Sequence, residues 1–228
     1  MTFPINEDLS FTDEDSFHSA DLTSLTSRVP RELQDLENLD ELIIHKTEGF
    51  CKLINKFEIM DNQNIIYLVV EDYGSRCSTC ISKVCCRQEF RYQLKISDAA
   101  GNEVIRFLHP ATQRCQCCND LQRMEVFSPP GNLIGSIQQE YNDYDFILAL
   151  CGPRENVMLV LRGCQRMFRC KKFQITLPDL LTKVGKIVDV TRWGFTTGYK
   201  VTFDKDLGVK RKAIILGACF LIDAMFCK

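Results

Sequence analysis

The stretch VKRKAIILGACFLIDAMFCK, residues 209–228, decides the fold of this chain. A triplet of basic residues, Lys210–Lys212, precedes fifteen residues, 213–227, in which Asp223 carries the only charge. A helix of that length spans roughly 22 Å at about 1.5 Å per residue. A bilayer core is about 30 Å thick and needs about 20 apolar residues. The segment is therefore short for a membrane span.

Two interpretations of this helix compete. A short helix that is apolar on all sides is typical of a protein interior, and Asp223 at bilayer depth would cost about 3 kcal/mol. The basic triplet supports a membrane span instead, because positive charge flanks the cytoplasmic ends of spans. We predict a core helix over residues 213–227 and keep a span as the alternative. The side chains expected to face the core or the bilayer are Ile214, Ile215, Leu216, Phe220, Leu221, Ile222, Asp223 and Phe226, and the basic flank comprises Lys210, Arg211 and Lys212.

Upstream of this segment, from Leu42 onward, short runs with period two replace any helical pattern. Examples are FEIMD, NIIYLVVED, FRYQLKIS and KKFQITLP, each bounded by polar residues or glycine, as β-strands are. About ten such runs with no long helix among them predict an all-β assembly. Closing the sheet into a barrel would remove its exposed edges. A barrel with the C-terminal helix through its centre satisfies both patterns.

The N-terminal arm differs in composition from the rest of the chain. Residues 1–27 carry six acids and no Lys or Arg. The net charge of the whole chain is −2, so removing those six negative charges leaves +4 on residues 28–228. We expect residues 1–39 to be a mostly disordered acidic arm, with a short helix possible across PRELQDLENLDEL, and residues 40–228 to form one domain. The mildly basic body permits contact with anionic lipid or nucleic acid without requiring either.

Thirteen cysteines are many for a chain whose first residues, MTFPINEDLS, are acidic where a secretory signal is basic. We expect reduced thiols, because adjacent cysteines such as Cys85 and Cys86 rarely pair and a cytosolic chain keeps its thiols reduced. Three uses then remain open: buried structural thiols, metal ligands, or thioester-linked acyl chains.

The C-terminal motif LGACFLIDAMF after a basic triplet resembles the signature of the phospholipid scramblases. Further matches follow in the same order as in that family: LDELIIHKTEGF, FEIMDNQNIIYLVVEDYGSRCSTC, GNEVIRFLHPATQRCQCC and MEVFSPPGNLIGSIQQ. The similarity covers about residues 40–227. It implies a tubby-like fold, which is a closed antiparallel β-barrel around a hydrophobic C-terminal helix. It also implies ATP-independent, calcium-linked, bidirectional movement of phospholipids between leaflets, with the protein on the cytoplasmic face of the plasma membrane.

The resemblance carries an acylation cluster onto the stretch RCQCCND. We expect palmitate on the three thiols there, because two acyl chains anchor a protein far better than one. Small turn residues or metal ligands are the other interpretations of the same thiols. The predicted lipidation residues are Cys115, Cys117 and Cys118.

The calcium loop of the family matches FTTGYKVTFDKDLG, where most of the acids are missing. Only Asp204 and Asp206 remain, with Lys205 between them. Calcium takes six to eight oxygen ligands, several of them carboxylates. We therefore predict weak or no calcium binding here, although calcium is the cofactor that the resemblance implies.

A structural zinc is a rival interpretation of the cysteines. Two CxxC pairs have the spacing of zinc knuckles, although the gap between them is longer than usual. The four thiols of this alternative site are Cys77, Cys80, Cys115 and Cys118.

Catalysis is disfavoured, because His45 and His109 have no nucleophile motif beside them and His18 falls in the acidic arm. The strongest competing function is a membrane-associated module that binds lipid or protein without scrambling lipids itself. Moving a headgroup across a bilayer requires a polar path, which one apolar helix does not supply. The partner predicted by either interpretation is a phospholipid membrane, and no nucleic acid is predicted.

Overall fold

The computed structural model is described for most of the chain from Arg31 onward. The described ranges are 31–48, 55–61, 64–72, 92–110, 121–129, 131–142, 144–164, 172–190 and 197–226.

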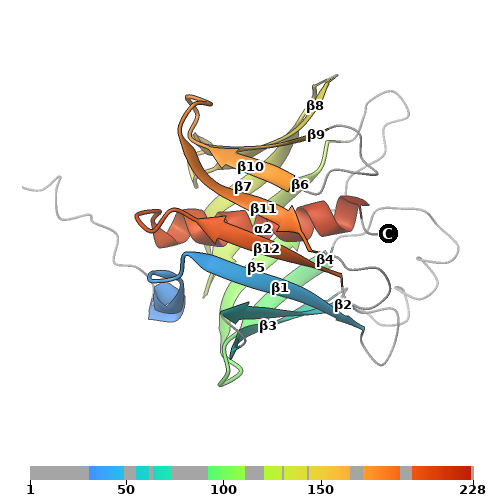
Figure 1. Cartoon of the computed structure of the whole chain (residues 1–228). Helices are drawn as coiled ribbons and strands as arrows, with labels where there is room; N and C mark the ends of the chain where they lie inside the picture. The colour runs from blue at the N-terminus through green and yellow to red at the C-terminus, as the bar shows by residue number, and fades with distance from the viewer. Residues whose placement is uncertain are drawn as a thin grey trace, which may run out of the picture.

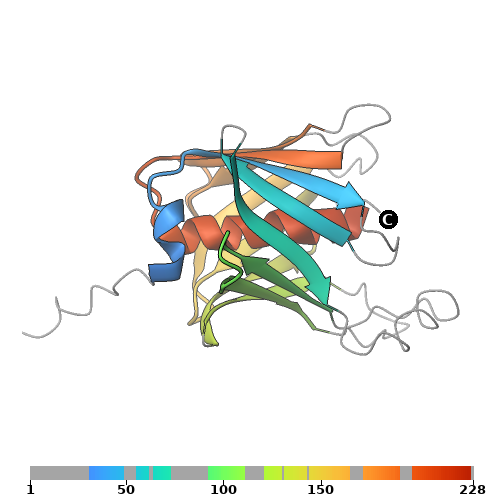
Figure 2. The same cartoon turned by 90° about the horizontal axis from the view of Figure 1, so that it is seen from below.

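Twelve strands of the described chain form a closed antiparallel barrel in which each strand pairs with the next and β12 closes onto β1. Figure 1 shows the strands wrapped around one long helix, α2, and Figure 2 shows the same arrangement from below. The strands are β1 Glu41–Glu48, β2 Asn55–Asp61, β3 Asn64–Asp72, β4 Tyr92–Ser97, β5 Glu103–His109, β6 Arg123–Ser128, β7 Asn132–Glu140, β8 Asp145–Cys151, β9 Val157–Cys164, β10 Lys172–Thr176, β11 Lys183–Asp189 and β12 Thr197–Phe203.

Alternating burial along the strands explains the barrel. In β6, for example, Met124 and Val126 are fully buried while Arg123 and Glu125 lie on the outer face. Side chains of a strand point alternately to the two faces of a sheet. Repeating this pattern around a closed sheet produces an apolar interior, which α2 fills. The predicted mainly β fold with a helix inside the barrel is confirmed.

The barrel contains more strands than the ten or so predicted, and β1 is the clearest omission. Its inward positions are Leu42 and Ile44, which are buried, followed by Lys46. A charged residue at an inward position ends the alternation after two repeats, so the sequence pattern alone does not indicate a strand there.

The C-terminal helix α2 runs Val209–Phe226, so it begins four residues before the predicted start at residue 213. The basic triplet Lys210–Lys212, which precedes the apolar run, thus lies in the first turn of the helix. Lys212 itself is fully buried, at 0% exposure. Within the described residues, no helix is both long enough and apolar enough to cross a bilayer.

A short 3-10 helix, η1 (Arg31–Leu36), lies within the segment predicted to be mostly disordered. Leu33 and Leu36 are fully buried, and η1 packs against α2. It covers the end of the barrel at which α2 begins, as Figure 2 shows. We call this end the η1 end and the opposite one the Asp223 end. Odd-numbered strands run toward the Asp223 end and even-numbered strands toward the η1 end, because all neighbours are antiparallel.

Candidate functional site

The helix α2 lies at the centre of the barrel and packs closely against its wall. Phe220 packs edge-on against Phe57 with ring centroids 5.1 Å apart and also contacts Phe107 at 5.5 Å. Gly217 allows the helix to approach the wall closely, since a Cβ there would lie 2.8 Å from the Ile137 side chain. The predicted helix residues from Ile214 to Asp223 are buried, while Phe226 is half-buried. The apolar surface of α2 is therefore used for contacts within the barrel.

Lys212 is a buried cation at the η1 end. Its Nζ donates hydrogen bonds to the carbonyl oxygens of Leu36 at 3.1 Å, Glu37 at 2.8 Å and Leu39 at 2.7 Å. These carbonyls belong to the last residue of η1 and to the turn that follows it. The last carbonyls of a helix have no donors within the helix, so Lys212 supplies one. The amine also lies 5.8 Å from the ring centre of Phe203. Lys212 therefore ties the segment before β1 to the start of α2.

Burial lowers the pKa of Lys212, and the nearby carboxylates of Asp40 and Glu37 oppose that shift. Two effects thus act on the amine in opposite directions. Removal from water disfavours the charged form, while the carboxylates and the three carbonyl acceptors favour it. Its neighbours in the triplet, Lys210 and Arg211, are half-buried.

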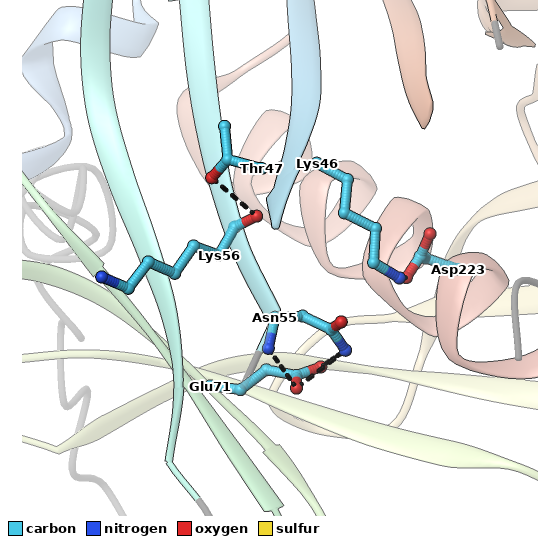
Figure 3. A network of polar contacts seen from close by, with 6 residues as sticks. All are labelled: Lys46, Thr47, Asn55, Lys56, Glu71 and Asp223. Atoms are coloured by element: carbon cyan, nitrogen blue, oxygen red, sulfur yellow. Dashed lines mark hydrogen bonds and ion pairs between the residues drawn. The ribbon is translucent and has the colours of Figure 1, made fainter. Parts of the chain in front are cut away.

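An ion pair occupies the Asp223 end. Lys46 Nζ on β1 lies 2.8 Å from Asp223 Oδ2 on α2, and the two side chains are 19% and 5% exposed. Figure 3 shows Lys46 reaching from its strand to the helix, with the hydrogen-bonded pair Asn55 and Glu71 below it. Both Glu71 oxygens accept hydrogen bonds from the Asn55 amide at 2.9 Å. The Asp223 charge is thus accommodated by protein contacts.

The two carboxylates expected at the calcium loop lie between β12 and α2. Asp204 and Asp206 are both exposed, and the Asp206 backbone N–H donates to Asp204 Oδ1 at 3.5 Å. Lys205, between them, is directed toward Asp40 at 3.7 Å. Among the described residues, no group of three or more His, Cys, Asp or Glu side chains could hold a metal ion.

The predicted lipidation and zinc residues all lie outside the described residues. The lipidation residues Cys115, Cys117 and Cys118 belong to 111–120, and Cys77 and Cys80 belong to 73–91. Residues 111–120 connect β5 to β6, whose adjoining ends are at the Asp223 end of the barrel. Their assignment stays a prediction.

Two cysteines that the structure does describe are interior thiols. Cys151 on β8 and Cys219 on α2 are free and buried, and burial raises the pKa of both thiols. Cys219 Sγ donates to the carbonyl of Ile215 at 3.4 Å. A protonated thiol is a poor nucleophile. These two residues are structural.

Two of the three histidines, His45 and His109, lie in the part of the chain that the structure describes. His109 is buried, with Nε2 2.9 Å from Gln122 Oε1, and His45 is half-buried on β1. His18 lies outside the described residues. Within the described chain, this arrangement offers no template for acyl transfer or hydrolysis of the kind that a nucleophile–base pair supplies.

Sequence reasoning missed the partner of Asp223 and the role of Lys212. A carboxylate within an apolar helix signals that a partner exists, but 177 positions separate Lys46 from Asp223, so only the closed barrel identifies it. The exposed β10–β11 turn, described below, also gave no pattern that stood out.

Comparisons with known proteins match this chain to one family. The scramblase family model matches residues 19–228. Human phospholipid scramblase 1 is 30% identical over 223 residues, covering 86% of this chain and 66% of that protein. Human phospholipid scramblase 2 is 30% identical, covering 86% of this chain and 70% of the relative. Human phospholipid scramblase family member 5 is 31% identical, with 88% and 79% covered. The chain spans about two thirds of the length of the first two relatives. With a family model matched over most of its length and relatives of this identity, the chain belongs to the scramblase family.

Proposed function

We propose that this chain promotes ATP-independent, bidirectional movement of phospholipids between the two leaflets of a membrane. The observation that carries the proposal is the family match over residues 19–228, together with relatives that are named phospholipid scramblases. The proposed activity moves lipid without changing its covalent structure, so the chain acts as a translocator and not as a classical enzyme.

Reconstitution tests this activity directly. The purified full chain is incorporated into liposomes that contain a fluorescent phospholipid, and a reductant added outside bleaches the outer leaflet only. We expect bleaching to continue beyond the outer-leaflet fraction when the chain is present. Bleaching that stops at the plateau of empty vesicles, with and without calcium, would rule out intrinsic scrambling.

For membrane attachment, we propose thioester-linked palmitate on Cys115, Cys117 and Cys118, which places the chain on the cytoplasmic face of the plasma membrane. Each buried CH₂ contributes about 0.8 kcal/mol, and stable anchoring requires two chains. Replacing all three residues by serine should release the chain from cell membranes and remove hydroxylamine-sensitive label. The matched control replaces Cys85 and Cys86 and should leave both unchanged. Equal labelling of the two variants would place acylation elsewhere.

Calcium is the cofactor that family membership implies, and we propose that it binds weakly or not at all at Asp204 and Asp206. Two exposed carboxylates with Lys205 between them provide little of the charge that calcium requires. Titration calorimetry should detect no micromolar site. A micromolar site that disappears in Asp206→Ala would contradict the proposal.

A zinc ion held by Cys77, Cys80, Cys115 and Cys118 is the alternative use of these thiols. Metal analysis of the purified chain separates the two uses, because a structural zinc appears at one equivalent and acylated thiols bind none.

A second candidate function is a membrane-associated module that binds lipid or protein without intrinsic scrambling. The observation favouring it is the packing of α2, whose side chains from Ala213 to Asp223 are buried inside the barrel. The apolar surface that would otherwise meet lipid is already occupied. In the reconstitution experiment this function predicts vesicle binding without accelerated bleaching.

A further inference from the structure

Exposed cations are aligned on the outer face of β9, β10 and β11. Arg162 on β9 and Lys186 on β11 flank Gln174 on β10 in register, and both cations are exposed. Lys172 precedes Gln174 by two residues, so it shares this face of β10. Lys183 is exposed at the start of β11, next to the β10–β11 turn. We call these four cations, Arg162, Lys172, Lys183 and Lys186, the basic wall.

The three strands contain few acidic residues. The only acid in β9, β10 and β11 is Asp189, the last residue of β11. Its register partner on β12 is Tyr199, which is buried. Register partners point to the same face of a sheet, so Asp189 belongs to the inner face. The outer face of these strands is therefore positively charged.

Two leucines occupy the turn that joins β10 to β11 at the η1 end. Leu180 is 42% exposed and Leu181 is 83% exposed. The Asp179 carboxylate fixes this turn by accepting hydrogen bonds from Leu181 N, Thr182 N and Thr182 Oγ1 at 2.7–3.0 Å. The hydroxyl of Thr182 and these backbone groups lower the pKa of Asp179. The turn thus holds its two leucines outward in a fixed conformation.

The backbone of Leu180 gives an independent indication of function. Its φ is 62°, in the left-handed region that glycine and asparagine adopt most easily. A bulky residue there is uncommon, and its strain is of order 1–3 kcal/mol. Glycine or asparagine would suit the turn better, so folding alone does not account for leucine at this position.

We propose that the basic wall and the Leu180–Leu181 turn together form a surface that binds an anionic lipid bilayer. The leucines enter the apolar boundary of the bilayer while the cations meet anionic headgroups, as in other interfacial elements that combine the two kinds of residue. This inference rests on the proposed function for its partner and adds the part of the chain that contacts lipid. A bilayer accounts for both kinds of residue together, because it presents anionic headgroups above an apolar boundary.

The surface also fixes an orientation. β10 runs from the Asp223 end to the η1 end, so Lys172 lies near the Asp223 end and Leu181 at the η1 end. Binding through the whole surface lays the barrel on its side, with α2 parallel to the bilayer. The adjoining ends of β5 and β6 are at the Asp223 end, so acyl chains proposed for Cys115, Cys117 and Cys118 are compatible with the same orientation.

The test is flotation of the full chain, purified without acyl chains, with vesicles of phosphatidylcholine alone or mixed with phosphatidylserine. One variant removes two wall charges, Arg162→Gln with Lys186→Gln, and its control removes two other charges, Lys56→Gln with Lys205→Gln. The second variant is Leu180→Asn with Leu181→Ser. Its control is Leu68→Thr with Val70→Thr on β3, where the leucine and valine are 46% and 42% exposed.

We expect the chain to bind the phosphatidylserine vesicles more tightly. Each cation near an anionic surface contributes about 1 kcal/mol, so the wall variant should bind about 30-fold more weakly. The turn variant should bind about tenfold more weakly, and its Tm should stay equal or rise because asparagine suits the left-handed position. Both controls should stay within about twofold of the unaltered chain. Raising the salt concentration should weaken binding of the unaltered chain, and should weaken binding of the wall variant less, because that variant keeps only two of the four cations.

Several results would overturn the inference. These are no flotation of the unaltered chain, equal flotation of wall and control variants, or a turn variant that binds normally. Self-association lost in the turn variant would assign the surface to a second copy instead. The lipid-movement assay is independent, because detergent-mediated reconstitution brings the chain into the vesicles without a docking step from solution. Bleaching at the empty-vesicle plateau despite normal flotation would reject the scrambling proposal alone, whereas accelerated bleaching by a wall variant that no longer floats would leave that proposal intact.

Discussion

Replacing Lys212 by methionine tests most directly whether the buried amine ties the start of α2 to the segment before β1. Methionine keeps much of the length of the side chain and removes the amine. Three carbonyl oxygens, of Leu36, Glu37 and Leu39, then lose the donor that lies 2.7–3.1 Å away. A buried polar group left without its partner costs about 1–3 kcal/mol. The Leu36 contact is buried and the other two are partly buried, so we expect a total loss of about 3 kcal/mol.

Thermal unfolding measures this loss. For a domain of this size, 1 kcal/mol corresponds to about 2–4 °C in Tm, so we expect a drop of about 6–12 °C. Lys210→Met is the matched control, because Lys210 is in the same triplet and is half-buried. A substitution at such a position usually changes stability by no more than about 0.5 kcal/mol. A Lys212→Met chain that melts with the control would refute a structural role for this amine.

The pH dependence provides a second readout. Burial lowers the pKa of Lys212 below its ordinary value of 10.5. The unfolded chain therefore holds this proton more tightly than the folded chain does, and stability due to this group rises with pH through the window between the two pKa values. The stability difference between the original chain and Lys212→Met should therefore widen on approach to pH 10.5. A difference that narrows there would contradict the assignment of burial as the dominant cause.

Three further predictions concern other contacts. Lys46→Met removes the amine that lies 2.8 Å from Asp223 Oδ2 and should destabilise the chain by about 3–5 kcal/mol in chemical denaturation. Adding Asp223→Leu should recover most of that loss, and equal losses in the single and double variants would show that the pair is not coupled. Gly217→Val should destabilise the chain by about 1–3 kcal/mol through overpacking, and an unchanged Tm would mean that the helix is less tightly enclosed. Thr182→Val removes the largest cause of the lowered pKa of Asp179, so that pKa should rise toward 3.8 in an NMR titration. Because the folded pKa of Asp179 is lowered, its carboxylate stabilises the folded chain above pH 3.8, and this stabilisation is lost as the pH falls through the folded pKa. An unchanged titration in Thr182→Val would show that the Thr182 hydrogen bond does not lower this pKa.

The sequence predicts the barrel well because the interior is apolar and each strand alternates. It predicts the core position of α2 for a different reason, which is that fifteen residues are too few for a span. It fails where charge enters the interior. Lys46 interrupts the alternating pattern of β1, so the pattern does not predict that strand. A basic residue before an apolar run, such as Lys212, is compatible both with the flank of a membrane span and with the start of a core helix. Only the three-dimensional position of η1 distinguishes them.

The proposed lipid-binding surface was missed for a related reason. Its cations belong to three strands, and Arg162, Lys172 and Lys186 come together through the pairing register. The window 162–172 is basic in the sequence, but it does not show that Lys186 lies beside Arg162 and Lys172. Leu180 and Leu181 appear in the sequence as two apolar residues between strands, and their exposure follows from the turn that Asp179 fixes.

The two charges on α2 have a further consequence for its position. Close packing at Gly217 and Phe220 favours one seating of the helix, and the two charges add partners that differ between the ends of the barrel. Lys212 and Asp223 are eleven residues apart, or about 17 Å along the axis at about 1.5 Å per residue. Their described partners lie at opposite ends of the barrel, η1 for Lys212 and Lys46 for Asp223. Together they fix the direction, depth and rotation of the helix, a registry role that buried polar groups have in coiled coils. A state in which α2 left the barrel for a bilayer would separate Lys46 from Asp223 and remove the donor of three carbonyls at once. The same contacts that set the register therefore oppose the use of this helix as a membrane span.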